Sequence, residues 1–119
     1  MKKLLFFCTI LTAFITFQSN IILKKVPRIL VFSKTKGFRH NSIEAGKTAL
    51  IKIGKEKNFV VDTTENAALF TSDLLKKYAA VVFLNTTGDV LDNQQQTAFE
   101  NYIKEVKEGK FPEDKHSFH

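Results

Sequence analysis

The sequence predicts an α/β fold in which helices flank a parallel sheet. Three short apolar runs, within residues 29–32, 59–61 and 79–84, are rich in β-branched and aromatic residues, which is typical of buried strands. Segments with helical patterns lie between and after these runs. Strands that alternate with helices imply parallel pairing through right-handed crossovers. The pattern matches the first half of a flavodoxin-like or Rossmann-like sheet, which usually has about five or six strands.

The first expected strand is Ile29–Phe32, and a loop from Lys34 to Ser42 follows it. Asn41 with Glu44 three residues later is a capping-box pattern, which predicts that a helix begins there. Apolar residues then recur at helical spacing and carry this helix to about Lys57. The predicted apolar stripe of the helix is Ile43, Gly46, Ala49, Leu50 and Ile53.

The second expected strand is Phe59–Val61, and the polar residues 63–66 after it predict a loop. Thr71 or Ser72 is placed to cap a short helix that runs through Tyr78, because their hydroxyl groups can accept from the first backbone amides.

The third expected strand is Ala79–Leu84, a continuous apolar run typical of a buried strand, and the polar residues 85–89 follow it. Asp92 and Gln95 have capping-box spacing and begin a helix that runs to about Val106. The predicted apolar stripe of this last helix is Ala98, Phe99, Tyr102, Ile103 and Val106.

Residues 1–20 have the layout of a secretory signal peptide, with basic Lys2 and Lys3, the apolar run Leu4–Phe17 and a polar exit. The run is shorter than the roughly 20 residues of a membrane span. Residues 21–27 form a linker. We therefore expect a periplasmic or extracellular protein with no membrane contact after signal cleavage. The alternative is an uncleaved membrane anchor that extends through Leu23.

Basic residues concentrate in the first half of the chain. Residues 24–57 carry ten Lys and Arg against two Glu, whereas residues 58–103 carry two Lys against six Asp and Glu. Such a basic half could bind nucleic acid. However, no aromatic residues interleave with its lysines as stacking platforms, and many of these lysines fall on the polar side of the first helix. We therefore expect a solvated helix face and no nucleic-acid partner.

Cys8 is the only cysteine, and it lies inside the first apolar run. Its loss on cleavage leaves no disulfide, thiol nucleophile or thiolate metal site. His40 and Asp89 are the one plausible pair of metal ligands, and a site needs more side chains that converge. The sequence therefore predicts no metal.

Sequence segments at three places resemble the ThuA-like (trehalose-utilisation) family. They lie within residues 28–42, 61–65 and 80–99 and include Gly-Phe-Arg-His-Asn-Ser and Ala-Val-Val-Phe-Leu-Asn-Thr-Thr-Gly-Asp. The resemblance covers residues 28–105. It implies a flavodoxin-like fold similar to that of class I glutamine amidotransferases. It also implies a link to carbohydrate metabolism, including trehalose and keto-sugars, in proteins that are often secreted.

The chain departs from the family pattern after residue 105. Members continue with a Gly-rich turn and then a strand and turn of the Phe-Val-Gly-Ile-His-Ala-Ala kind, whereas Gly109-Lys110-Phe111 stands at that place here. We therefore interpret residues 28–105 as a partial, truncated ThuA-like domain that is inactive alone. Residues 106–119 are expected to be a non-homologous, disordered tail. The open sheet edge of such a fragment predicts self-association.

Arg39 and His40 are the candidate catalytic residues. They follow the first strand, and ligands of open α/β sheets bind at such strand ends. His40 can act as a general base or bind a sugar hydroxyl. Arg39 can hold an anion or a carbonyl oxygen through its fork of donors. The alternative is that both residues brace the loop.

The candidate substrate-binding residues follow the third strand. In a 2-1-3 strand order this strand neighbours the first, so the two loops should converge. Amide and hydroxyl groups there can hydrogen-bond a sugar, and a carboxylate can accept protons. The alternative is a turn that these residue types build for local backbone reasons. The residues are Asn85, Thr86, Thr87 and Asp89.

The predicted ligand is a small sugar, bound without a cofactor. The alternative function is a non-catalytic module that binds carbohydrate or flavin. Ser33-Lys-Thr-Lys-Gly37 faintly resembles the flavodoxin phosphate loop, since hydroxyls and backbone amides at a helix start suit a phosphate. No Trp or Tyr lies in a loop where it could stack on the flavin ring.

Overall fold

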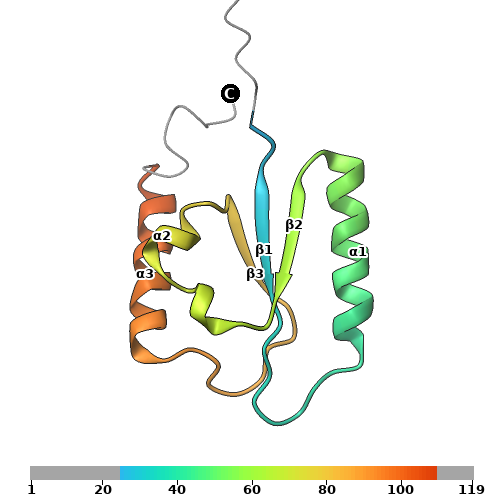
Figure 1. Ribbon diagram of the computed structural model, residues 1–119, viewed down its shortest axis with the longest axis horizontal. Coiled ribbons are helices and arrows are strands. Elements are labelled where there is room, and N and C mark those ends of the chain that lie inside the picture. Colours follow the sequence, from blue (N-terminus) through green and yellow to red (C-terminus); the bar gives the residue numbers. More distant parts are fainter. Residues whose placement is uncertain (1–24, 110–119) are drawn as a thin grey trace, which may run out of the picture.

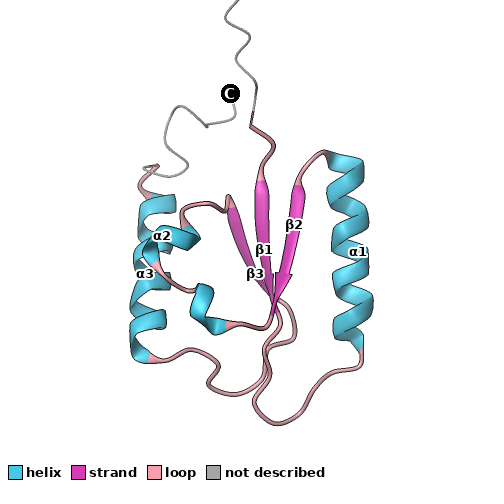
Figure 2. Cartoon of the chain, viewed as in Figure 1, coloured by secondary structure: helices cyan, strands magenta, loops and turns pink. Residues whose placement is uncertain are grey.

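The computed structural model describes residues 25–109 as one α/β unit (Figures 1 and 2). The expected signal peptide, the alternative anchor and most of the expected tail lie outside these residues. The elements are β1 (Arg28–Phe32), α1 (Ser42–Lys57), β2 (Val60–Thr64), the 3₁₀ helix η1 (Ala67–Leu69), α2 (Ser72–Leu75), β3 (Ala80–Phe83) and α3 (Asn93–Lys107).

The three strands form a parallel sheet in the order β2-β1-β3, as the sequence predicted. The central strand β1 pairs Leu30 with Asp62 on one side and with Val81 on the other. Figure 2 shows α1 on one side of the sheet and α2 and α3 on the other. This three-layer arrangement confirms the expected flavodoxin-like class of fold.

The main core lies between the sheet and the layer of α2 and α3. Leu30 and Phe32 of β1 are fully buried there, together with Phe70, which follows η1. The ring centroids of Phe32 and Phe70 lie 4.6 Å apart in an edge-to-face arrangement, and those of Phe83 and Phe99 lie 5.1 Å apart. Such aromatic pairs add about 0.5–1.5 kcal/mol to the free energy gained from burial alone.

The strand β3 is less buried than expected. Its run of apolar residues predicted a strand covered on both faces, but Ala80 and Phe83 are exposed. The reason is position, because β3 is an edge strand of the described sheet and β1 is the central one. Only β1 is buried as the sequence pattern predicted, with Leu30, Val31 and Phe32 fully covered.

The two predicted capping boxes have different outcomes. At α3 the box is complete, because the Asp92 side chain accepts from the backbone of Gln95 and the Gln95 side chain accepts from the backbone of Asp92. At α1 the helix begins where the pattern predicted, but the capping box does not form. Asn41 has helical backbone angles and makes no side-chain cap, and the carboxylate of Glu44 binds basic side chains instead.

The structure between Thr63 and Tyr78 differs from the sequence prediction in three ways. Thr63 and Thr64 belong to β2, because they pair with β1, and β-branched residues suit a strand. The 3₁₀ helix η1 was not predicted. The helix α2 ends at Leu75, and single turns bonded through backbone groups lead from there to Tyr78. Thr71, one of the two expected caps, accepts from the backbone of Leu74.

The helix α1 packs on β2 through Gly54, where the backbones approach closely. A Cβ atom at Gly54 would lie 2.7 Å from the carbonyl oxygen of Phe59 and 2.8 Å from a methyl group of Val61. At Gly46, about two helical turns earlier, the nearest atoms belong to the end of the Leu84 side chain, at 3.0 Å. A Cβ atom at Gly54 would thus meet rigid backbone, whereas one at Gly46 would meet a flexible side chain.

This difference predicts unequal effects of two Gly-to-Ala substitutions in one helix. Alanine normally stabilises a helix interior by about 0.5–1 kcal/mol over glycine. At Gly54 the clash reverses this, and we expect Gly54→Ala to lower the free energy of unfolding by about 1–3 kcal/mol. Gly46→Ala, the matched control, should stay within about 1 kcal/mol of the wild type. Urea unfolding measures both, and equal effects would contradict the packing.

Candidate functional site

The loops after β1 and β3 converge at the carboxyl ends of the strands. Thr35 and Thr87 form an isolated parallel bridge, and the backbone amide of Lys36 donates to the carbonyl oxygen of Thr87 over 2.8 Å. The sequence prediction that these two loops meet is therefore confirmed. We call residues 34–41 and 85–89 together the strand-end loops.

Side chains of the strand-end loops strengthen this junction. The Thr87 hydroxyl donates to the carbonyl oxygen of Phe38 over 2.6 Å. The Asn85 side-chain amide donates to the Ser42 hydroxyl over 2.8 Å, which ties the end of β3 to the start of α1. Two of the four predicted substrate-binding residues therefore hold the loops together. Thr86 lies between them and is half-buried.

Two residues of the loop 85–89 have a left-handed backbone. Asn85 has φ 49°, a region that asparagine tolerates better than most residues. Gly88 has φ 77°, and a Cβ atom there would lie 2.8 Å from the carbonyl oxygen of Lys36. The Asn-Thr-Thr-Gly sequence therefore suits the local backbone conformation, which was the alternative interpretation of this loop. The same residues also place polar groups at the strand ends.

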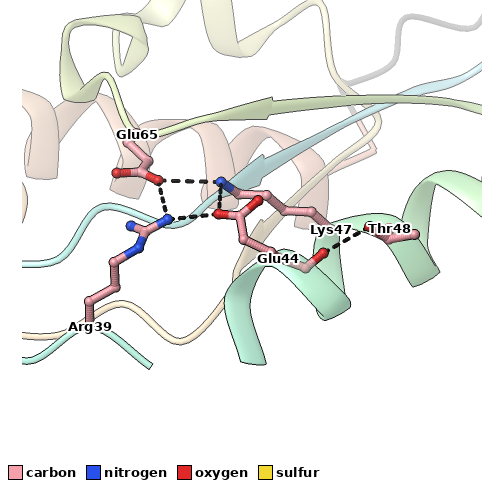
Figure 3. Close-up of polar contacts among 5 residues, drawn as sticks. All are labelled: Arg39, Glu44, Lys47, Thr48 and Glu65. Atoms are coloured by element: carbon pink, nitrogen blue, oxygen red, sulfur yellow. Dashed lines mark hydrogen bonds and ion pairs between the residues drawn. The ribbon is translucent and has the colours of Figure 1, made fainter. Parts of the chain in front are cut away.

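Arg39 belongs to a network of four charged residues that joins its loop to α1 and to the end of β2 (Figure 3). Its Nη2 atom lies 2.8 Å from Oε1 of Glu44 and 2.8 Å from Oε1 of Glu65. Lys47 approaches the same two oxygens, at 3.2 and 3.3 Å. Two cations and two anions balance, so the network as a whole is neutral.

The network shifts the pKa values of Arg39, Glu44 and Glu65 in the direction that favours their charged forms. The pKa of Glu65 lies below its ordinary value of 4.5, chiefly because Arg39 donates to its carboxylate. The pKa of Glu44 is lowered too, chiefly by the hydrogen bond from Lys47. The pKa of Arg39 is raised, chiefly by its hydrogen bond to Glu65. Because these groups are exposed, their contribution to stability is small.

His40, the other predicted catalytic residue, is exposed at the tip of the loop before α1. Its ring centroid lies 4.9 Å from that of Phe38 in an edge-to-face contact, and Phe38 is itself 70% exposed. The backbone oxygen of His40 accepts from the amide of Ile43, which begins the first turn of α1. The imidazole is therefore on the surface beside an exposed aromatic ring.

Asp89, the last predicted site residue, is turned toward α3. The side chain of Gln96 donates to its carboxylate over 3.3 Å and to the carbonyl oxygen of Leu91 over 2.9 Å. Asp89 is exposed, so its carboxylate can still accept from solvent or a ligand. The four predicted substrate-binding residues share one loop, but Asp89 lies at the end of it that leads to α3.

A hollow that sequence reasoning did not predict as a site lies between the segment from η1 to α2 and the start of α3. It holds about 310 Å³ and includes none of the predicted site residues. The sequence did single out four of its residues, Thr71, Ser72, Asp92 and Gln95, but as helix-capping residues rather than as ligand contacts. The lining residues are Ala68, Phe70, Thr71, Ser72, Asp92, Gln94, Gln95 and Ala98.

The part of the chain that the structure describes holds no group of three or more His, Cys, Asp or Glu placed to bind a metal ion. Over those same residues, no helix has the length and apolar character to cross a membrane. The Ser33 hydroxyl, one of the groups of the possible phosphate loop, is fully buried and has no hydrogen-bond partner among residues 25–109. It is thus not on the surface where a phosphate would bind.

The charge network predicts a specific change in the titration of Glu65. Replacing Arg39 with glutamine removes the main hydrogen bond that lowers the pKa of Glu65, so this pKa should rise toward its ordinary value. An NMR titration of the side-chain carboxyl resonance measures it. Arg28→Gln is the matched control, because it removes another exposed arginine pair, with Asp62, and should leave Glu65 unchanged.

The sign of the linked stability follows from the direction of the shifts. Since the folded pKa values of Glu44 and Glu65 are lowered, their ion pairs stabilise the folded chain above pH 4.5, and this stabilisation is lost as the pH falls through the lowered values. The stability difference between wild type and Arg39→Gln should shrink over that window. A difference that does not change with pH, or an unchanged Glu65 titration, would contradict the network.

Comparisons with known proteins agree with this arrangement. The sequence profile of the trehalose utilisation family, ThuA, matches residues 28–108. A comparison with curated proteins finds no match. The solved structure of a ThuA-like protein from Bacteroides uniformis ATCC 8492 is similar, with 24% sequence identity and a TM-score of 0.52.

The similar region covers 66% of this chain and 33% of the Bacteroides protein, so the chain spans about a third of the length of that structure. At this identity the likeness shows the fold. The profile match begins with β1 and ends one residue after α3, and thus includes the whole described sheet and all its helices. On that match, the chain belongs to the ThuA (trehalose utilisation) family.

Proposed function

We propose that this chain is the N-terminal part of a secreted ThuA-like domain, and that its strand-end loops bind a neutral sugar such as trehalose or a keto-disaccharide. The observation that carries the proposal is the Thr35–Thr87 bridge. It joins two polar loops at the carboxyl end of a parallel sheet, the place where ligands of such sheets bind. The signal-peptide layout of residues 1–20 supports export of the chain.

The ion pairs of Arg39 support a neutral ligand. Arg39 would be the natural group to bind a phosphate or carboxylate. In the structure, however, its Nη2 atom is shared by the carboxylates of Glu44 and Glu65. An anionic ligand at Nη2 would have to displace one of these carboxylates, and one at the other guanidinium nitrogens would lie near both of them. A hydroxylated, uncharged ligand meets no such repulsion and can use both donors and acceptors.

The proposed roles of the residues follow from their positions. His40 is exposed beside Phe38 and would act as a base or as a hydrogen-bond partner of a sugar hydroxyl. Arg39, fixed by its carboxylates, would orient the substrate and polarise a carbonyl oxygen. Asn85, Thr86 and Thr87 would hold hydroxyl groups, and the Asp89 carboxylate would accept protons at the other end of the loop.

We further propose that this chain alone binds its ligand without converting it, and that the proton-transfer and polarising roles of His40, Arg39 and Asp89 operate only in a complete domain. The similar Bacteroides structure is about three times as long as the region shared with this chain. Residues that complete a catalytic site could therefore lie in the part of the fold that this chain does not match. Binding without turnover also describes a carbohydrate-binding module, which was the alternative interpretation of the sequence.

Titration calorimetry tests the proposal on the full chain. We expect trehalose or a 3-keto disaccharide to bind, and His40→Ala to weaken this binding at least tenfold, or about 1.4 kcal/mol. Lys55→Ala is the matched control, because Lys55 is exposed near the far end of α1 and should not matter. A phosphorylated disaccharide should bind no more tightly than the neutral one.

Three results would count against the proposal. They are absence of binding by the wild type at millimolar sugar, equal binding by His40→Ala and the wild type, and a strong preference for the phosphorylated sugar. A purified protein with a flavin absorbance band would favour the flavin-binding alternative instead. A chain that releases product from the sugar would contradict the proposed lack of turnover.

A further inference from the structure

The exposed lysines of the described chain concentrate at the end of the sheet where the strands begin. There the backbone amide of Ala79, next to β3, donates to the carbonyl oxygen of Arg28 over 2.7 Å. Figure 1 shows that α1 and α3 both end at this side, and each has two lysines in its last turn. We call the exposed lysines of this end the basic face. They are Lys25, Lys55, Lys57, Lys76, Lys77, Lys104 and Lys107.

Acidic residues offset less than half of this charge. Asp62 is already paired with Arg28, over 2.6 Å. The ends of α1 and α3 add three glutamates, which are Glu56, Glu105 and Glu108. At the opposite end of the molecule the charges balance, because four basic and four acidic residues lie on and next to the strand-end loops. They are Lys34, Lys36, Arg39 and Lys47 with Glu44, Glu65, Asp89 and Asp92. The excess positive charge among residues 25–109 therefore lies at the basic face.

Apolar side chains are exposed among these lysines. Val26 is 41% exposed and Val60 is 38% exposed. They lie in neighbouring segments, because the backbone amide of Val60 donates to the carbonyl oxygen of Pro27 over 2.8 Å. On a membrane surface, lysines stay at the level of the lipid headgroups while apolar side chains enter the region below them. The basic face therefore combines both kinds of group that such a surface binds.

The sequence directly before the basic face is apolar as well. The apolar residues 4–17 and 21–23 are followed by Lys24 and Lys25. Three residues then separate Lys24 from the start of β1. A membrane that receives the apolar segment, in export or as an anchor, is thus held within a few residues of the basic face. This favours a lipid surface over a nucleic acid or a soluble acidic protein as the partner.

We propose that the basic face binds an anionic membrane surface, with lipid phosphate groups against its lysines. Each lysine near such a surface adds to the attraction, and basic clusters beside an apolar segment recognise anionic lipids in this way. The strand-end loops lie at the opposite end of the sheet and face the solvent, away from the membrane. The proposal concerns a different surface from these loops and does not depend on the proposed sugar ligand.

The sequence alone predicted no membrane contact after signal cleavage and a solvated face for the lysines of α1. These expectations treated each segment separately. The fold adds Lys76 and Lys77, from the connection between α2 and β3, and the last lysines of α3 to those of α1. Lysines from separate segments thus share one surface, which the periodicity of a single helix does not reveal.

Vesicle binding by the full chain tests the proposal. The wild type should bind vesicles of phosphatidylglycerol at least tenfold more tightly than vesicles of phosphatidylcholine, and added salt should reduce this preference. Residues 1–24 are the same in all variants, so their own contribution cancels when variants are compared. Lys55→Gln with Lys57→Gln should weaken binding to phosphatidylglycerol at least tenfold, because two charges are lost from the basic face.

Two further double variants make the test specific. Lys77→Gln with Lys107→Gln removes two charges from other segments of the basic face and should weaken binding to the same extent. Lys36→Gln with Lys52→Gln is the matched control, because both lysines are exposed and lie outside the basic face. It should change the affinity by less than about threefold, since salt screens distant charges.

A measurement on the wild type alone covers the case of a variant that fails to fold. In anionic bicelles with a paramagnetic headgroup, the amide resonances of Val26, Val60 and Lys77 should broaden more than those of Lys36 and Thr87. The proposal is overturned by equal affinities of the three double variants, by a wild type that does not prefer phosphatidylglycerol, or by uniform broadening. Tighter binding to a DNA duplex than to the vesicles would overturn it too, and would identify a nucleic-acid surface instead.

Discussion

The burial of β1 as the central strand is the constraint on which the rest of the structure depends. Leu30, Val31 and Phe32 are fully buried, and each such side chain gains about 1.5–3 kcal/mol on leaving water. Burial on both faces requires a helix layer on each side, and pairing on both edges requires β2 and β3. Parallel pairing in turn brings the ends of β1 and β3 to one place. The strand-end loops are therefore a consequence of how β1 is buried.

The sequence predicted this arrangement because its signals are local and strong. The apolar run of β1, the Asp92–Gln95 capping box and the β-α-β order each point to the same fold, and the convergence of the two loops follows from strand order. Predictions failed where tertiary contacts outweighed a local pattern. Glu44 has capping-box spacing from Asn41, yet its carboxylate binds Arg39 and Lys47 and not a backbone amide. The exposure of β3 depends on its neighbours, which its own residues do not encode.

The sequence predicted which residues lie at the candidate site, but not which residues they contact. Arg39 and His40 were selected as a pair, and the structure separates their environments: Arg39 is held among carboxylates, whereas His40 is exposed beside Phe38. No spacing rule could have found Glu65, because it comes from the end of β2 and meets Arg39 only through the fold. Asn85 and Thr87 likewise proved to hold the loops together, which makes the same residues structural and able to contact a ligand.

The central claim is that the strand-end loops, joined through Thr35 and Thr87, are a sugar-binding surface. NMR titration of the isotope-labelled chain with trehalose or a keto-disaccharide tests it most directly, because each backbone amide reports its own surroundings. We expect saturable shifts at the amides of Lys36, His40 and Thr87. Shifts confined to the hollow between α2 and α3, which Gln94 and Gln95 line, or no saturable shifts at all, would contradict it.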